Sequence, residues 1–195
     1  MQKIVLATKN NHKLTEFRAM LENVEILSLK DIGFNEEIDE TGDTLEENSK
    51  IKADAVREFL KKQNLDLPVV ADDSGLFIVA LDGAPGVHSA RYALDHDDEG
   101  NRQEVLKNMQ GVKDRTAYYE CCLCYEDSAQ TKYFSGKTMG QITTEKIGDE
   151  SFCYDCLFHS DDLNKTFGEA TEKEKDSVSH RGRAVQKFKE WLDEK

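Results

Sequence analysis

The chain has 195 residues, of which 33% are charged, and its 26 lysine and arginine residues against 39 aspartate and glutamate residues give a net charge of −13. DNA and RNA are polyanions that such a charge repels, so a nucleic acid polymer is not an expected partner. The length suggests one domain, residues 1–195, or one domain with two lobes, and the 38% of apolar residues suits a globular protein.

The apolar runs of the chain are short. The longest, Leu76–Leu81, cannot span a bilayer, and the run near the N-terminus is too short for the core of a signal peptide. We therefore expect a cytoplasmic protein that has no membrane partner and keeps its five cysteines reduced.

The first third of the chain predicts a strand followed by two helices. Lys3–Thr8 is apolar and β-branched, which is typical of a buried strand. After a polar loop, apolar residues at helical spacing predict a helix at 12–21. Thr44 and Glu47 fit a capping box and predict a second helix that runs to about Lys62.

The rest of the chain adds further strands. Val69–Ala71 predicts a buried strand that ends at Asp72 and Asp73, and Ser74-Gly75 is expected to be a turn. The remaining predicted elements are a structured glycine-rich loop at 82–92, a helix at about 101–109, a long strand at 115–127, a second strand at about 132–134, a bend into a further strand at 136–142, and a helix from about His180. Because consecutive strands are combined with strand–helix units, the fold class is α/β with a mixed sheet.

Polar side chains gather where these elements begin or end. Residues 8–13 place three basic side chains at a helix N-terminus, where backbone N–H groups attract phosphate; the alternative is an ordinary solvated helix start. Asp39 and Glu40 precede the second helix, whereas the acids inside its first turn can simply complement the helix dipole.

Asp72 and Asp73 are adjacent carboxylates, which repel each other unless a cation lies near them. The carboxyl end of a strand is where open α/β sheets place ligand chemistry. Because side chains alternate along a strand, one carboxylate can face a ligand while the other holds the turn. The alternative is an Asx turn at the end of the strand.

Two more polar clusters lie in the last quarter of the chain. The aromatic segment 151–158, interrupted by Asp155, suits a pocket that stacks a base, with ordinary core packing as the alternative. The segment 173–183 gathers cationic groups suited to phosphates or carbonyl edges, with surface charge as the alternative for its outer members. No P-loop and no Gly-x-Gly-x-x-Gly motif is present. With these nucleotide-binding motifs absent, the remaining pattern is a set of acidic residues that could bind a divalent metal and a set of cationic residues that could bind phosphates. Hydrolysis of a phosphoanhydride requires both.

Five motifs in order carry a resemblance that spans nearly the whole chain: "VLATKNNHKLTEF", "DETGDTLEEN", "ADDSGL", "GAPGVHSARY" and "SHRGRA". They resemble the inosine triphosphate pyrophosphatase family of nucleotide hydrolases. The resemblance implies Mg2+-dependent hydrolysis of ITP, dITP and XTP to the monophosphate and pyrophosphate. It also implies a long central mixed sheet flanked by helices, two lobes with the active-site cleft between them, and a homodimer.

The resemblance also assigns roles to residues. Asp73 would be the general base and a metal ligand, and Asp39 the second metal ligand, with Glu40 a close rival. The substrate-binding residues that it implies are Thr8, Lys9, Asn10, Asn11, His12, Lys13, Ser74, Phe152, Cys153, Tyr154, Asp155, Lys175, His180 and Arg181.

This chain departs from the family pattern in two segments, the loop at Lys9 and the segment 149–156, where Asp149, Glu150 and Ser151 stand in place of the usual glycines. Lys9 replaces a glycine, so that its backbone is strained or its ammonium adds a cation for phosphate. Cys153 and Cys156 replace a glycine and a proline. The resulting Cys-x-x-Cys, together with the cysteines of 121–124, admits a zinc site or a redox pair, although small buried residues are the simpler interpretation.

Two other functions remain open at this point. One is a Maf-like nucleotide pyrophosphatase that acts on modified or pyrimidine nucleotides. The other is a non-catalytic nucleotide-binding protein, which the altered aromatic segment would favour if it closed the pocket.

Overall fold

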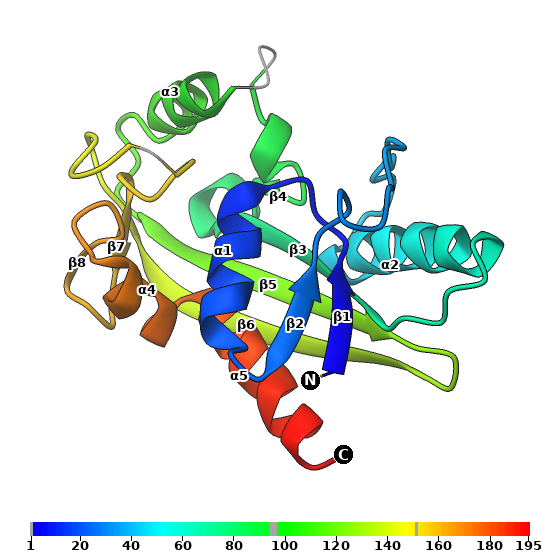
Figure 1. The fold of residues 1–195 in the computed structure, drawn as a ribbon. Helices are drawn as coiled ribbons and strands as arrows, with labels where there is room; N and C mark the ends of the chain where they lie inside the picture. Colours follow the sequence, from blue (N-terminus) through cyan, green and yellow to red (C-terminus); the bar gives the residue numbers. More distant parts are fainter. Residues whose placement is uncertain (1, 94–96, 151) are drawn as a thin grey trace. The chain divides into compact units, whose positions relative to one another are not determined.

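The computed structural model describes residues 2–93, 97–150 and 152–195 (Figure 1). Its elements are β1 (Gln2–Leu6), α1 (Asn11–Met20), β2 (Val24–Leu27), α2 (Leu45–Lys62), β3 (Val69–Ile78), η1 (Val79–Leu81), β4 (Pro85–Gly86), η2 (Ser89–Arg91), α3 (Asp98–Asn108), β5 (Thr116–Glu126), β6 (Thr131–Ile142), β7 (Phe158–Ser160), β8 (Lys165–Thr166), α4 (Glu172–Val178) and α5 (His180–Asp193). No helix in the described ranges has the length and the apolar composition that crossing a bilayer requires.

The strands form one mixed sheet. Their order is β2-β1-β3-β5-β6-β7-β8, and β4 pairs with β3 beside this path. β1 pairs in parallel with β2 and with β3. β7 is antiparallel to both β6 and β8. The predicted α/β class with a mixed sheet is therefore confirmed.

The chain divides into two compact units. Unit 1 comprises Met1–Asp73, Cys121–Ser135 and Ala184–Lys195, and unit 2 comprises Ser74–Glu120 and Gly136–Arg183. The division falls inside β3, β5, β6 and α5, so each of these elements contributes residues to both units.

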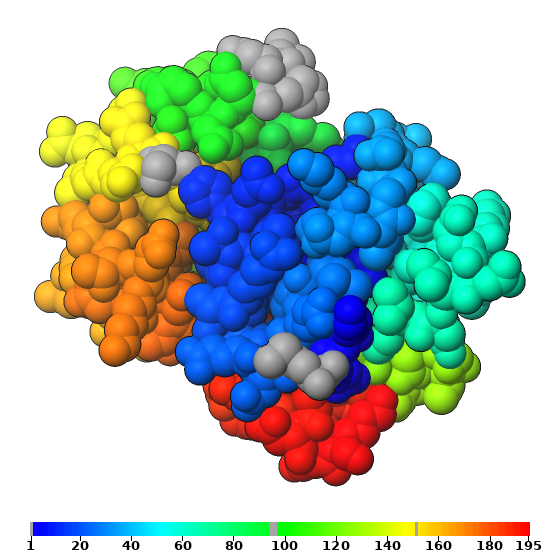
Figure 2. Space-filling model, in the orientation of Figure 1, coloured from blue at the N-terminus to red at the C-terminus, as the bar shows by residue number. Residues whose placement is uncertain are grey.

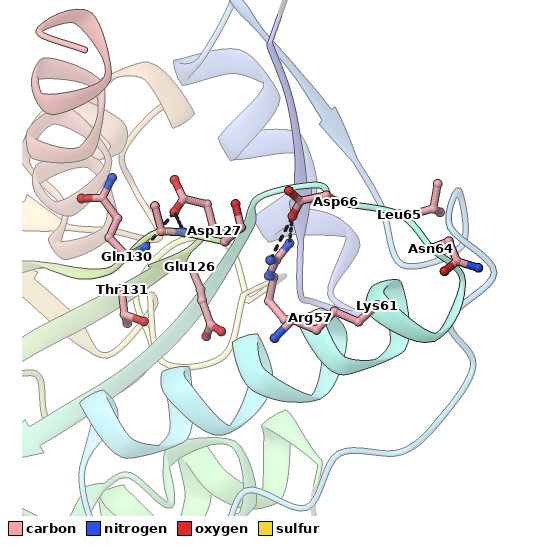
Figure 3. A pocket seen from close by; sticks show the side chains of 11 residues that line it. Arg57, Lys61, Asn64, Leu65, Asp66, Glu126, Asp127, Gln130 and Thr131 are labelled. Carbon is pink, nitrogen blue, oxygen red and sulfur yellow. Dashed lines mark hydrogen bonds and ion pairs between the residues drawn. The ribbon is translucent and has the colours of Figure 1, made fainter.

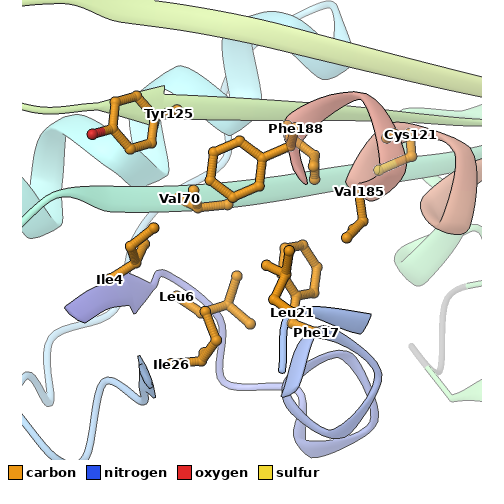
Figure 4. Packing of buried hydrophobic residues seen from close by; sticks show 12 residues of the cluster. Ile4, Leu6, Phe17, Leu21, Ile26, Val70, Cys121, Tyr125, Val185 and Phe188 are labelled. Atoms are coloured by element: carbon orange, nitrogen blue, oxygen red, sulfur yellow. The ribbon is translucent and has the colours of Figure 1, made fainter. Parts of the chain in front are cut away.

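In unit 1, helices cover both faces of the sheet. Figure 4 shows Phe17 of α1 and Phe188 of α5 in one apolar cluster with strand residues such as Leu6. On the opposite face, α2 contributes Val56 to a second cluster that contains Val5. Neighbouring residues such as Val5 and Leu6 join different clusters because side chains alternate across a strand. In Figure 2 the visible surface of this unit is blue to cyan for the residues up to α2, yellow-green for the segment that joins β5 to β6, and red for the C-terminal part of α5.

Unit 2 has its own apolar core. Val105 of α3, Tyr119 of β5, Phe158 of β7 and Phe167 are all buried in it. The ring centroid of Phe158 lies 4.8 Å from that of Tyr119 and 5.1 Å from that of Phe167, within the range of favourable aromatic pairs.

Capping boxes start two of the helices. Thr44 Oγ1 accepts a hydrogen bond from the Glu47 N–H at 3.1 Å, and the Glu47 carboxylate accepts one from the Thr44 N–H at 3.2 Å, as predicted. The same motif, formed by Thr171 and Glu174, starts α4, a helix that the sequence analysis did not predict.

Two predicted strand ends are wrong. The strand that was expected to stop at Asp72–Asp73 continues to Ile78 as β3, and the bend expected after Phe134 lies inside the single strand β6. The glycines of these segments serve close backbone approach rather than turns. A Cβ atom on Gly75 would lie 2.4 Å from the carbonyl oxygen of Gly86 in β4, and one on Gly140 would lie 2.3 Å from that of His159 in β7.

Candidate functional site

The start of α1 forms the first part of the candidate site, in unit 1. The Asn10 side chain caps the helix by accepting hydrogen bonds from the N–H groups of His12 and Lys13 at 2.9 and 3.2 Å. The Asn10 N–H in turn donates to Thr8 Oγ1 at 3.1 Å. The predicted segment Thr8–Lys13, including the exposed Asn11, therefore lies at a helix N-terminus, where the helix dipole favours an anion.

Lys9 adds a cation to this loop without backbone strain. It does not belong to the described residues that have a positive φ, so the predicted alternative of a strained backbone is not supported. Its ammonium lies 2.6 Å from a carboxylate oxygen of Glu37, and both side chains are exposed. This surface ion pair is weak and can release Lys9 to a more highly charged ligand.

Asp72 and Asp73 point to opposite faces of β3. Asp72 shares the face of Val70, covered by α1, and forms an ion pair with Lys13 of that helix. Asp73 shares the other face, covered by α2, and its Oδ1 lies 2.9 Å from the ammonium of Lys52. Strand alternation, which was expected to separate the two carboxylates, thus supplies each of them with a lysine from a different helix.

Asp73, Lys52 and Glu40 form a charged cluster, in which Asp73 and Lys52 are buried and Glu40 is half-buried. The Lys52 ammonium also lies 3.0 Å from Glu40 Oε2, and the side chains of Lys52 and Asp73 are each only 10% exposed. Oδ2 of Asp73 is buried and has no hydrogen-bond partner among the described residues. Such an unsatisfied carboxylate oxygen is expected where a ligand or an ion completes a site.

The acids of this cluster differ in proton affinity. Burial, with a smaller effect of the Glu40 charge, raises the pKa of Asp73 to about 6, although Lys52 opposes the rise. Burial also disfavours the charged form of Glu40, but the charges of Lys52 and Lys13 and the hydrogen bonds to Glu40 together outweigh it and lower that pKa. Burial would lower the pKa of Lys52, but the carboxylates of Asp73, Glu40 and Asp72 raise it, so this lysine stays charged. Near neutral pH, Asp73 is the more basic carboxylate of the cluster.

The cluster fits a hard divalent cation bound together with phosphate. No group of three or more His, Cys, Asp or Glu side chains that could hold a metal ion occurs in 2–93, 97–150 or 152–195. Mg2+, however, is commonly held by one or two carboxylates together with substrate phosphates and water. Glu40 and Asp73 offer such a pair, whereas Asp39 is exposed, so the geometry favours Glu40 over Asp39.

Lys52 is the functional residue that the sequence analysis missed. It lies on the apolar side of α2, and a lysine at such a position is a usable signal. A buried ammonium requires a carboxylate partner, so the nearest acids before the helix and at the strand end were its natural candidates.

A separate cluster of predicted residues lies within unit 2. The Lys175 ammonium donates to Asp155 and lies 4.1 Å from the centroid of the Phe152 ring. The guanidinium carbon of Arg181 lies 5.9 Å from the same centroid. Phe152 is half-buried, so this predicted set combines an aromatic face, two cations and a carboxylate. His180 is buried, and its ring stacks on Tyr119 with a centroid distance of 4.7 Å.

Tyr154 differs from the other predicted residues of the aromatic segment. It is 1% exposed within the apolar core of unit 2, and its hydroxyl donates to the carbonyl of Ser89 at 2.7 Å. The core-packing alternative describes Tyr154 and Phe158, and substrate binding by Tyr154 stays a prediction. Ser74 follows Asp73 in β3 and is half-buried; its contact with substrate stays a prediction.

Cys153 occupies a backbone conformation that favours glycine. Its φ is +26°, and its carbonyl accepts a hydrogen bond from Arg102 at 2.7 Å. The glycine expected here from the family pattern would adopt this φ without the steric cost of a Cβ atom. The departure at Cys153 therefore stores strain next to Phe152.

Replacing Cys153 with glycine is expected to raise stability by about 1 kcal/mol, because it removes the strain of a non-glycine residue at positive φ. Thermal unfolding measures the effect. Cys153→Ala is the matched control, since it removes the thiol and keeps the Cβ atom, and it should not stabilise. Equal stabilities of the two variants would contradict the strain.

Replacing Tyr119 with phenylalanine is also expected to stabilise. The Tyr119 hydroxyl is buried and has no hydrogen-bond partner among the described residues, so its removal should recover about 1 kcal/mol, or about 2–4 °C in Tm. In Tyr125→Phe, by contrast, a hydroxyl that donates to Asp127 at 2.9 Å is lost, and Tm should fall. A lower Tm for Tyr119→Phe would mean that the hydroxyl is satisfied in solution.

A pocket of about 740 Å³ lies elsewhere in unit 1 (Figure 3). It lies between the end of α2 and the turn that joins β5 to β6, and none of the predicted site residues lines it. Its charged side chains already have partners: Arg57 pairs with Asp66, Glu126 with Lys50, and Asp127 with Lys195. The pocket therefore contributes nothing to the candidate site.

Comparisons with known proteins agree with the predicted resemblance. A family model described as the Ham1 family matches residues 4–191. A dITP/XTP pyrophosphatase of Staphylococcus epidermidis is 42% identical over 195 residues, covering 99% of this chain and 97% of that protein. The solved structure of the Staphylococcus aureus Ham1 protein has a TM-score of 0.87 at 32% identity and 98% coverage of both chains. That of a HAM1 protein from Coxiella burnetii has a TM-score of 0.88 at 34% identity and 100% coverage of both.

Proposed function

The chain belongs to the Ham1 family, and from this premise we propose that it hydrolyses deaminated purine nucleoside triphosphates, namely ITP, dITP and XTP, to the monophosphate and pyrophosphate. Its similarity to a dITP/XTP pyrophosphatase supports this substrate class. We further propose that it acts in the cytoplasm on free nucleotides; its net charge of −13 disfavours nucleic acid polymers.

The observation that carries the proposal is the charged cluster of Asp73, Lys52 and Glu40. It combines a carboxylate whose pKa is raised to about 6 with an unsatisfied oxygen on the same side chain. We propose that Asp73 and Glu40 hold Mg2+, which would offset the charge of the triphosphate when it is bound.

In this mechanism the residues of unit 1 bind the phosphates and activate water. The N–H groups at the start of α1, together with Lys13, neutralise phosphate charge that would otherwise repel the nucleophile. Asp73 accepts a proton from a water molecule as its oxygen bonds to the α-phosphorus. The bond between that phosphorus and the bridging oxygen then breaks, and pyrophosphate leaves.

We assign recognition of the base to unit 2. Phe152, flanked by the cations of Lys175 and Arg181, offers a face on which a purine can stack. Donors directed at the 6-keto oxygen would be left unpaired by the 6-amino group of adenine, so the site would select against ATP. Asp155, paired with Lys175, fixes the position of that ammonium.

The test is pyrophosphate release from ITP, XTP, ATP, GTP, dTTP and UTP, with Mg2+ and with EDTA. Metal-dependent turnover of ITP and XTP in strong preference to the other four is the expected result. Preference for a pyrimidine nucleotide would support the Maf-like alternative. Nucleotide binding without turnover would support the non-catalytic one.

We propose that the protein is a homodimer. Apolar side chains of unit 2 that are exposed or half-buried support this. The rings of Phe77 and Tyr118 stack at 5.0 Å, and Lys137 lies over Tyr118. Met139, two residues from Lys137 in β6, is 42% exposed, and Val79, two residues after Phe77, is 49% exposed. Light scattering should give twice the mass of one chain, and Met139→Glu should shift the protein toward the monomer. A monomeric wild-type protein would contradict the proposal.

A further inference from the structure

The buried carboxylate of Asp72 contacts a thiol as well as a lysine. Its side chain has no solvent exposure, and its Oδ1 forms the ion pair with Lys13. Its Oδ2 lies 3.2 Å from the sulfur of Cys121 in β5. Cys121 is itself fully buried, in the cluster that α1 and α5 form with this face of the sheet.

The direction of the hydrogen bond follows from the charges. A carboxylate that pairs with an ammonium is ionised, and an ionised carboxylate only accepts hydrogen bonds. The thiol of Cys121 is therefore the donor, and a distance of 3.2 Å is short for a sulfur donor. Burial strengthens such a bond, because no water competes for the carboxylate.

This contact fixes how the carboxylate is turned. The χ2 torsion of an aspartate has no sharp energy minimum, so by itself it does not fix the orientation of the carboxylate. Rotation about χ2 would exchange the two oxygens of Asp72 or turn them away from their partners. A donor on Oδ2 keeps Oδ1 toward Lys13. Lys13 has a long flexible side chain that is only 16% exposed, so its position depends on the acceptor that holds it.

We propose that Cys121 is a positioning residue for phosphate binding: its thiol holds Asp72, and Asp72 holds the ammonium of Lys13 at the start of α1. The inference rests on the proposed role of Lys13 in binding the triphosphate. Cys121 does not touch the substrate and takes no part in the chemical step.

The affinity for inorganic tripolyphosphate, measured by calorimetry, tests the contacts from Cys121 through Asp72 to Lys13 independently of turnover. Cys121→Ala should weaken binding about five- to tenfold, because one charge-assisted hydrogen bond is lost. Cys121→Ser keeps a donor and should remain within about threefold of the wild type. The matched control is Cys124→Ala, which removes an equally buried thiol from the other face of the same strand and should change binding less than about twofold.

The frequency of the S–H stretching band in the infrared spectrum distinguishes a positioning role from a purely structural one. The band of a thiol that only fills space would not shift when phosphate binds. Difference spectra of the wild type against Cys121→Ser and against Cys124→Ala isolate the two bands. The band of Cys121 should lie at the lower frequency, as hydrogen bonding to a carboxylate requires. It should move lower still when tripolyphosphate shares the Lys13 ammonium with Asp72, because the carboxylate then becomes a stronger acceptor for the thiol, while the band of Cys124 stays in place.

Three results would overturn the inference: a Cys121 band no lower than that of Cys124, unchanged tripolyphosphate affinity in Cys121→Ala, or a wild-type protein that does not bind tripolyphosphate. If Cys121→Ala fails to fold, the infrared experiment still tests the inference, because the Cys121 band is obtained from the difference spectrum of the wild type against Cys121→Ser. Failure of the proposed function is a separate result: tripolyphosphate binds and the bands behave as expected, but no triphosphate is hydrolysed.

Discussion

Replacing Asp73 with asparagine is expected to lower the turnover of ITP and XTP by about 1,000-fold or more, because an amide cannot accept the proton of the attacking water. The fold should survive the change. Asparagine has nearly the same volume, and Lys52 keeps the carboxylate of Glu40 at 3.0 Å as its partner. Pyrophosphate release and thermal unfolding, measured on the same preparation, separate the two effects.

The control for this variant is Asp54→Asn. Asp54 is an exposed residue of α2 that pairs only with the neighbouring Lys50 among the described ion pairs, so its loss should leave turnover unchanged. Retention of more than about a tenth of the activity in Asp73→Asn would remove Asp73 from the role of base.

The dependence of activity on pH in the wild type also tests Asp73 as the general base. Because the pKa of Asp73 is raised to about 6, the base is ionised above that pH and protonated below it. The kcat/KM value should therefore fall about tenfold for each unit of pH below about 6. The Asp73→Asn variant should lose this acidic limb.

Replacing Lys52 with methionine is expected to destabilise the protein by about 3 kcal/mol, because the buried carboxylate of Asp73 and the half-buried carboxylate of Glu40 lose the cation between them. The side chain of Lys52 is only 10% exposed, so water cannot take the place of the ammonium. Urea unfolding measures the loss. Lys62→Met, at an exposed position of the same helix, should cost less than about 0.5 kcal/mol.

The deficit of Lys52→Met should depend on pH. The folded-state pKa of Asp73 already lies above its unfolded value, and removal of Lys52 raises it further. Protonation then relieves the repulsion with Glu40, so the deficit should be smaller near about pH 5 than near about pH 8. Mg2+ should raise the Tm of Lys52→Met more than that of the wild type, since both carboxylates are then free to hold it. A deficit that neither acid nor Mg2+ reduces would mean that lost packing, not charge, is its cause.

Local signals in the sequence predicted much of the fold. The apolar run of β1, the spacing in α1 and the capping box of α2 each depend on residues close together in the chain. The same kind of reasoning failed at Gly75 and Gly140. Their close contacts are with Gly86 and His159, and nothing near either glycine in the sequence identifies those partners.

The candidate site shows the same limit. The acids and the loop 8–13 were found because strand ends and helix starts are marked in the sequence. The partner that holds each carboxylate was not found, because Lys13 lies 59 residues from Asp72 and Lys52 lies 21 residues from Asp73. The choice between Asp39 and Glu40 required the position of Lys52, which only the folded chain provides.

The opposed directions of Asp72 and Asp73 also limit which insertions and deletions this chain can tolerate. Adding one residue to β3 ahead of the pair would turn each carboxylate toward the helix that now serves the other. Two ion pairs and the unsatisfied oxygen of Asp73 would be lost together, although no side chain had been replaced. Length changes in this family should therefore concentrate in the loops, and β3 should keep a constant number of residues between its pairing with β1 and the two aspartates.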